Sequence, residues 1–160
     1  MSAPHRIDEA AFGVVYGTIT VMGLLLAMDP DHIEPLRAAG YLFVSVLAVA
    51  MAKAFAELCE TALKTGQNAR PADIASAWQH SRTTLIAANG PTAAFLVAAT
   101  GLIDGATAHA LAQLLAIALL CAFGVRIGRA LDGTVRASLI GAAVCGGIGL
   151  AIALLKNAIH

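Results

Sequence analysis

The sequence predicts an all-α polytopic membrane protein with five transmembrane helices. Three observations predict this class: 59% of the 160 residues are hydrophobic, only 12% are charged, and apolar runs close to 20 residues long recur along the chain. A soluble domain carries roughly 25% charged residues, and a helix needs about 20 apolar residues to cross the hydrocarbon core. The alternating pattern of a membrane β-barrel is absent. We therefore expect one helical membrane domain over residues 1–160.

The five expected spans cover residues 10–28, 41–62, 83–103, 106–128 and 136–155. The third span contains Gly90-Pro91, and because proline lacks an N–H and clashes with the preceding turn, we expect a kink or a break there. The longest polar stretch, residues 64–82, separates the second and third spans. Within it, residues 72–80 are predicted to form a short amphipathic helix on the membrane surface, with Trp78 as an interfacial anchor.

Lysine and arginine are distributed unevenly between the two expected sides of the membrane. With five spans, the amino terminus and the loops after the second and fourth spans share one side. That side holds seven basic residues, Arg6, Lys64, Arg70, Arg82, Arg126, Arg129 and Arg136, whereas the opposite side holds Arg37 and Lys156. The positive-inside rule assigns the more basic side to the cytoplasm. We expect a multi-pass protein of the inner membrane, with a cytoplasmic amino terminus and the carboxyl terminus outside.

The second span contains three ionisable residues, Lys53, Glu57 and Glu60. Their spacing of four and three residues places them on one helical face. An ionisable group at the centre of a span costs about 2.5–3.5 kcal/mol on insertion scales, so it usually faces a partner or a watery cavity. One interpretation is a cation site or gate, with Glu57 and Glu60 as candidate metal ligands and Lys53 as a gate residue. The other is a Lys53–Glu57 pair that neutralises itself while both side chains reach towards water.

Small residues four positions apart predict close helix packing in the first and last spans. Gly13 and Gly17 form a G-x-x-x-G step in the first span. Between them, Tyr16 lies about 9 Å from the cytoplasmic side at the rise of an α-helix. This depth is close to that of Lys53 and Glu57, which makes Tyr16 a second candidate gate residue. In the last span, a tightly packed or self-associating helix is predicted by the pairs Ala142/Gly146, Ala143/Gly147 and Cys145/Gly149.

The sequence lacks the usual signatures of enzymes. No Walker A motif, H-E-x-x-H, G-x-S-x-G or paired C-x-x-C occurs, so we expect no catalytic residue and no cofactor. The formal net charge is zero, without a basic stripe, which argues against nucleic acid as a partner. The expected partners are the lipid bilayer and a second copy or a larger membrane complex. The acidic segment around His32 (DPDHIE) is a weaker candidate metal site at the outer face.

Three segments resemble parts of a known family of five-span transporters. Residues 10–19 (AAFGVVYGTI) are similar, in their glycines, to a first-helix motif close to A-x-F-G-x-N-D-G-x-V. Residues 52–58 (AKAFAEL) resemble a second-helix stretch ending S-M-x-x-G-E-Y, and residues 136–141 (RASLIG) resemble a last helix that opens with arginine before L-I-G. These segments, in this order, are similar to the vacuolar iron transporter family, whose members have a cytoplasmic amino terminus.

The resemblance implies that Glu57 is a retained glutamate of a divalent-metal path. Tyr16 stands where the family has a metal-carrying aspartate, and Lys53 stands where it has a methionine. Residues 64–82 replace the acidic metal-binding bundle of the plant members. The chain is thus expected to be a short, diverged bacterial relative that keeps the scaffold and lacks the bundle.

Two classes of function follow from these features. The first is a small secondary transporter, dimeric because five helices enclose little space alone, that moves a divalent cation (Fe²⁺ or Mn²⁺) or protons along Glu57 and Glu60. Lys53 would act there as an internal counter-charge. The second is a non-transporting accessory or assembly subunit of a larger membrane complex, which the missing metal ligands and the small-residue helix faces favour. Flux that depends on Glu57 would distinguish the two classes.

Overall fold

The computed structural model describes residues 3–29, 32, 34–68 and 70–159, with side chains described from 12 onward and up to 155. These residues form six α-helices, which confirms the all-α prediction. The helices are α1 (Ala3–Ala27), α2 (Pro35–Thr65), α3 (Pro71–Ser81), α4 (Thr83–Ala99), α5 (Gly105–Asp132) and α6 (Val135–Ile159). Each predicted span corresponds to one of these helices, and the polar stretch after the second span supplies the sixth.

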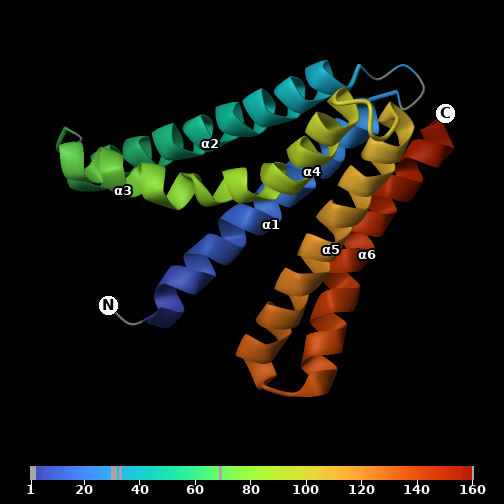
Figure 1. The fold of residues 1–160 in the computed structure, drawn as a ribbon. Coiled ribbons are helices and arrows are strands. Elements are labelled where there is room, and N and C mark those ends of the chain that lie inside the picture. Colours follow the sequence, from blue (N-terminus) through green and yellow to red (C-terminus); the bar gives the residue numbers. More distant parts are fainter. Residues whose placement is uncertain (1–2, 30–31, 33, 69, 160) are drawn as a thin grey trace.

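The helices form a wedge with two arms (Figure 1). In one arm α2 runs beside α4 and α3, in the other α5 and α6 form a hairpin, and α1 lies between the arms. The end of α1, the start of α2, the α4–α5 connection and the end of α6 meet at the closed end of the wedge. The start of α1, the α2–α3 turn and the α5–α6 turn lie at its spread ends. This alternation of helix ends agrees with the connectivity predicted from the sequence.

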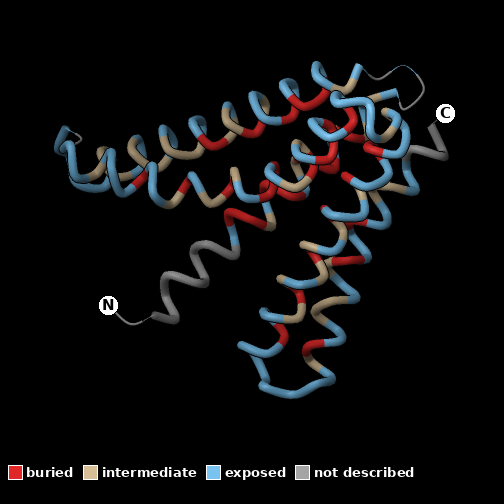
Figure 2. The backbone as a smooth tube through the Cα atoms, in the orientation of Figure 1, coloured by how far each residue is buried: buried red, intermediate tan, exposed pale blue. Residues whose placement is uncertain are grey.

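Three of the helices are long and apolar enough to cross a membrane: Pro35–Thr65, Gly105–Asp132 and the part of α6 from Val135 to Leu155. The apolar stretches Phe12–Ala27 and Thr83–Ala99 are shorter. Only 17–22% of the most apolar window in each long helix is buried inside the molecule, and exposed residues cover the outer sides of both arms (Figure 2). Apolar side chains facing outward along the helices are what a lipid environment requires. The chain is therefore a helical membrane protein with three candidate spans.

The expected break in the third span is wrong, because α4 runs as one helix from Thr83 through Pro91 to Ala99. Proline removes a single N–H donor, and α4 is held on several sides by its contacts with α1, α2 and α5. The helix also ends four residues before the predicted boundary at Ile103. Gly101 follows with φ of 83°, a left-handed conformation that suits glycine and ends the helix.

The polar stretch after the second span is mostly helical, as predicted for residues 72–80. Helix α3 begins with Pro71 in its first turn, and the Asp73 carboxylate accepts a hydrogen bond from the Arg70 backbone N–H at 2.8 Å. These are the features of a capped helix start. In Figure 1, α3 continues the line of α4 and packs along the last turns of α2. The α2–α3 turn thereby extends the hairpin beyond α4.

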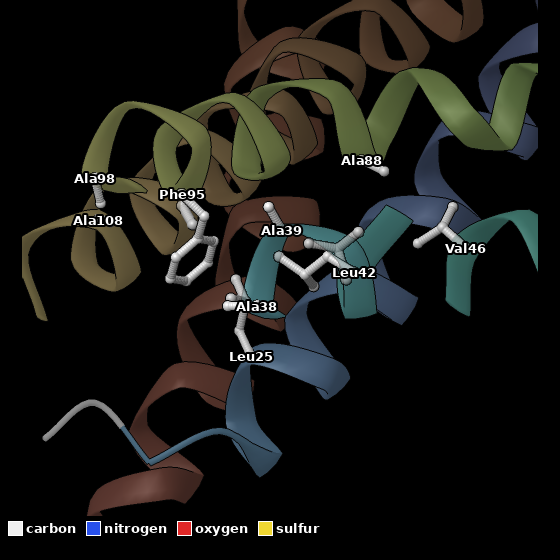
Figure 3. Packing of buried hydrophobic residues seen from close by; sticks show 11 residues of the cluster. Leu25, Ala38, Ala39, Leu42, Val46, Ala88, Phe95, Ala98 and Ala108 are labelled. Atoms are coloured by element: carbon white, nitrogen blue, oxygen red, sulfur yellow. The ribbon is translucent and has the colours of Figure 1, made fainter. Parts of the chain in front are cut away.

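The main hydrophobic cluster lies near the closed end of the wedge, where four helices meet. Phe95 of α4 is the largest fully buried side chain, and it packs in one cluster with Leu25 of α1 and Leu42 of α2 (Figure 3). The buried His109 of α5 joins this region, since its Nε2 lies 2.9 Å from the backbone carbonyl oxygen of Leu25. The imidazole thus gives a second hydrogen bond to a carbonyl in the last turns of α1, which also accepts one from the Met28 backbone N–H at 3.3 Å.

Glycines set the closest helix contacts. A Cβ placed on Gly124 or Gly128 of α5 would collide with backbone atoms of α6, and one on Gly141 would collide with α5. A Cβ on Gly17 of α1 would lie 2.5 Å from the carbonyl oxygen of Thr84 in α4. A Cβ on Gly13 would likewise meet Thr83 and Thr84 of α4. The predicted packing roles of Gly13 and Gly17 are therefore confirmed. In α6, the predicted small-residue face is used within the chain, because Gly146 and Gly149 face α5 whereas Gly147 faces open space.

Candidate functional site

The ionisable residues of α2 find different partners on different helices. Lys53, Glu57 and Glu60 lie on the last four turns of α2, which ends at Thr65. Here α3 packs along one side of α2, and α1 approaches it from another. The residues are on one helical face, as their spacing predicts, but the structure does not gather them around a single centre.

Glu57 is hydrogen-bonded to His80 of α3. The His80 Nδ1 lies 2.8 Å from the Glu57 Oε1, and the side chains are 39% and 33% exposed, respectively. On the same face of α3, Ala77 and Ser81 are buried against the rest of the molecule. The helical period of α3 thus turns His80 towards α2. This half-buried carboxylate–imidazole pair links the two helices of the extended hairpin.

Lys53 lies against aromatic side chains of α1. Its Nζ is 4.8 Å from the centre of the Phe12 ring, a distance typical of a cation–π contact. The Phe12 ring is stacked on Tyr16, with 6.2 Å between centroids and 16° between planes. These three side chains line a pocket of about 370 Å³ between α1 and α2, together with Val49, Ala52 and Ala56. Tyr16 and Lys53 therefore line the same pocket, as their predicted depths suggest, and each of them contacts Phe12.

Glu60 turns away from both of these contacts and pairs with Lys64 one helical turn later. Both side chains are more than half exposed. Glu57 and Glu60, the two carboxylates predicted as metal ligands, therefore have separate partners. Within the described part of the chain, no group of three or more His, Cys, Asp or Glu side chains is arranged to hold a metal ion. The predicted Lys53–Glu57 ion pair is also not formed among these residues.

The acidic segment at the closed end of the wedge contains two local ion pairs. The His32 Nδ1 lies 2.9 Å from an Asp29 carboxylate oxygen, and the Arg37 Nε lies 2.8 Å from a Glu34 oxygen. These side chains are all more than half exposed. Asp31, which belongs to the predicted weaker metal site together with Asp29, His32 and Glu34, lies outside the described residues. The contacts that are described hold the segment together through neighbours in sequence.

His80 is the functional candidate that the sequence interpretation missed. It lies 23 residues from Glu57, so no local spacing connects them. A signal was available in the hairpin geometry. In an antiparallel hairpin that turns near Gly66–Arg70, positions equally far from the turn lie side by side, and 57 and 80 are such a pair.

Comparison of the chain with family models, curated proteins and solved structures finds no match.

Proposed function

We propose that this chain is a small five-span transporter of the inner membrane that moves a cation, with the Glu57–His80 pair as its proton-handling site. The distribution of basic residues supports a cytoplasmic amino terminus. The observation that carries the proposal is the 2.8 Å contact between Glu57 and His80. A carboxylate and an imidazole in contact within a membrane protein are typical of proton relays.

Protons fit this site better than a divalent metal ion does. Lys53 lies one helical turn from Glu57, and a fixed ammonium group opposes the approach of Fe²⁺ or Mn²⁺. A proton needs no ligand cage, only groups that exchange it over hydrogen-bonding distance. The resemblance to the vacuolar iron transporter family is retained at the level of the scaffold, and a homodimer would provide the second wall of the path.

The wedge shape supports a path along α2. The Glu57–His80 pair lies between the main hydrophobic cluster, whose α2 residues end at Val46, and the α2–α3 turn. That turn lies at a spread end of the wedge (Figure 1). Both side chains are partly exposed, so water can reach them from that end. In a transporter that works by alternating access, water reaches the site from one side of the membrane at a time. A site that is open towards the spread end and shut at the closed end corresponds to one such state.

Proton flux into proteoliposomes tests the proposal. The purified chain is reconstituted with a pH-sensitive dye inside the vesicles, and a potassium diffusion potential drives the flux. We expect Glu57→Gln to lower the flux at least about tenfold, the effect of a lost proton relay group. The matched control is Glu60→Gln, the same change one turn away on a carboxylate paired with Lys64, and its flux should equal that of the wild type.

Wild-type flux in the Glu57→Gln variant would refute the assigned role. Parallel measurements with Fe²⁺ and Mn²⁺ outside the vesicles distinguish metal transport from proton flux. If no cation moves at all, the accessory-subunit function becomes the better interpretation. That class predicts stable co-purification of the chain with a larger membrane complex in mild detergent.

A further inference from the structure

We propose that the pocket between α1 and α2 binds the headgroup of an anionic phospholipid, with Lys53 as its charged contact. The inference does not depend on the proposed transport function, because it concerns a different pocket and a different residue. It follows from the lining of the pocket, from the charge balance around Lys53 and from its level along α2.

The pocket combines one cation with apolar walls. Its volume is about 370 Å³. Of the described residues that line it, Lys53 is the charged one, and the others are Phe12, Tyr16, Val49, Ala52 and Ala56. Phe12 is 64% exposed and Tyr16 is 46% exposed, so the aromatic wall faces outward instead of closing over the site. An amphipathic anion matches this lining, since its charged group can meet the ammonium while its chains lie along the apolar side chains.

The charge of Lys53 is not neutralised within the described part of the chain. Glu57 is bonded to His80, Glu60 is paired with Lys64, and no described carboxylate forms an ion pair with Lys53. Its recorded contact is the face of the Phe12 ring, which attracts a cation and leaves its charge in place. A lipid phosphate would supply the missing negative charge.

The position of Lys53 along α2 fits the level of lipid headgroups. Residues 38–52 of α2 carry no charged side chain, and at 1.5 Å per residue they span about 22 Å. Lys53 is the first charge after this apolar stretch, and Glu57, Glu60 and Lys64 follow it towards the end of α2. Its long side chain can therefore reach the boundary of a hydrocarbon core about 30 Å thick.

The charge of the surrounding surface and its exposed apolar residues favour a lipid over a soluble anion. Lys64, Arg70 and Arg82 lie on the same hairpin, beyond the apolar stretch of α2, and basic residues close to a membrane surface attract anionic lipids. Phe55 and Met51, which flank Lys53 on α2, are 69% and 58% exposed. Such side chains would contact acyl chains beside the pocket, whereas an inorganic anion would leave them without a partner.

Native mass spectrometry of the full-length chain in detergent tests the inference. The protein is titrated with phosphatidylglycerol and, separately, with phosphatidylcholine of the same acyl chains. We expect the first lipid-binding step of the wild type to favour phosphatidylglycerol about fivefold, the factor that corresponds to one lysine–anionic lipid contact. Lys53→Met should abolish this preference and Lys53→Arg should keep it. Lys64→Met removes a paired, exposed cation and should leave the preference unchanged.

The outcomes separate the alternatives. Equal preference in the wild type and Lys53→Met would overturn the proposal, and so would an equal loss in Lys53→Met and Lys64→Met, because the effect would then be one of general charge. Displacement of the bound lipid by millimolar inorganic phosphate would identify a soluble-anion site and also overturn it. Lys53→Arg is the control for misfolding, because it keeps the positive charge and should keep the lipid preference. Phe12→Leu changes the wall of the pocket, and loss of the preference in this variant would locate binding at this pocket.

Discussion

Replacing Gly124 with alanine tests the close contact between α5 and α6. A Cβ at this position would lie 2.6 Å from the carbonyl carbon of Gly141 and 2.9 Å from the backbone nitrogen of Ala142, where ordinary van der Waals contact starts at 3.4 Å. These are backbone atoms, so no side-chain rotation can relieve the clash, and the two helices must separate. Overpacking lowers the free energy of unfolding by about 1–3 kcal/mol. Because the clash is with the backbone of α6, we expect a loss close to about 3 kcal/mol.

The reason for so large an effect is that helix association in a membrane depends on packing. Lipid chains are as apolar as the helix surfaces, and close approach through small residues supplies the van der Waals contacts that hold helices together. Separation of α5 and α6 weakens contacts along much of their shared length, because Gly128 forms a second close contact one turn away. The measurement is unfolding in mixed micelles with increasing SDS, followed by helicity.

The matched control for this measurement is Gly147→Ala on α6. A Cβ at Gly147 meets no atom within 4 Å, so its stability should stay within about 0.5 kcal/mol of the wild type. If Gly124→Ala were as stable as the wild type, the close contact would be wrong. If both variants lost the same stability, the loss would come from glycine replacement in general and not from the α5–α6 contact.

Three further perturbations test other contacts. His109→Leu removes the group that meets the Leu25 carbonyl, and we expect the same titration to show a loss of about 1–3 kcal/mol. Gly17→Ala drives a methyl group into the backbone of α4, and a loss of about 1–3 kcal/mol is expected. The Thr107 backbone N–H lowers the pKa of the Asp104 carboxyl from its ordinary value of 3.8. Because the folded-state pKa is depressed, this cap stabilises the protein above pH 3.8, and its contribution is lost as the pH falls through the lowered pKa.

Each of these perturbations has a control and a contradicting result. For His109, the glutamine variant keeps a donor, so equal losses in the leucine and glutamine variants would argue against the hydrogen bond. For Gly17, the control is Gly23→Ala, where a Cβ meets nothing within 4 Å. For Asp104, the asparagine variant keeps a capping oxygen without a titrating charge, and its stability below pH 3.8 should fall less steeply than that of the wild type. An identical acid profile would exclude the cap as the cause.

Much of the fold could be predicted because membrane helices depend on local composition. Each of the five predicted spans overlaps one helix, although α1 and α2 begin at Ala3 and Pro35, before the predicted starts at 10 and 41. The amphipathic pattern of residues 72–80 identified α3. The failure at Pro91 has a tertiary cause. Proline predicts a kink or a break from local chemistry alone, whereas α4 stays one helix through Pro91 and contacts three neighbouring helices.

The candidate site could be predicted only in part. Helical spacing correctly placed Lys53 and Glu57 on one face, and one of the two interpretations drawn from it was that they pair with each other. The partners that they have come from distant segments, His80 for Glu57 and Phe12 for Lys53. Spacing along one helix carries no information about which residue of a neighbouring helix lies opposite. That pairing depends on the hairpin turn between α2 and α3 and on the angle at which α1 crosses α2.

The two partnerships make physical sense of an otherwise costly arrangement. Within an apolar span, a buried Lys53–Glu57 pair would carry the desolvation cost of both ions, which can exceed their mutual attraction. In the structure the hairpin extension carries His80 to Glu57 in the part of α2 that is partly exposed, whereas Lys53, one turn deeper, meets an aromatic ring at the wall of a pocket. Glu57 is thus in contact with an imidazole, and among the described residues no carboxylate pairs with Lys53. Separate partners for neighbouring charges let one helix carry the two sites that we propose.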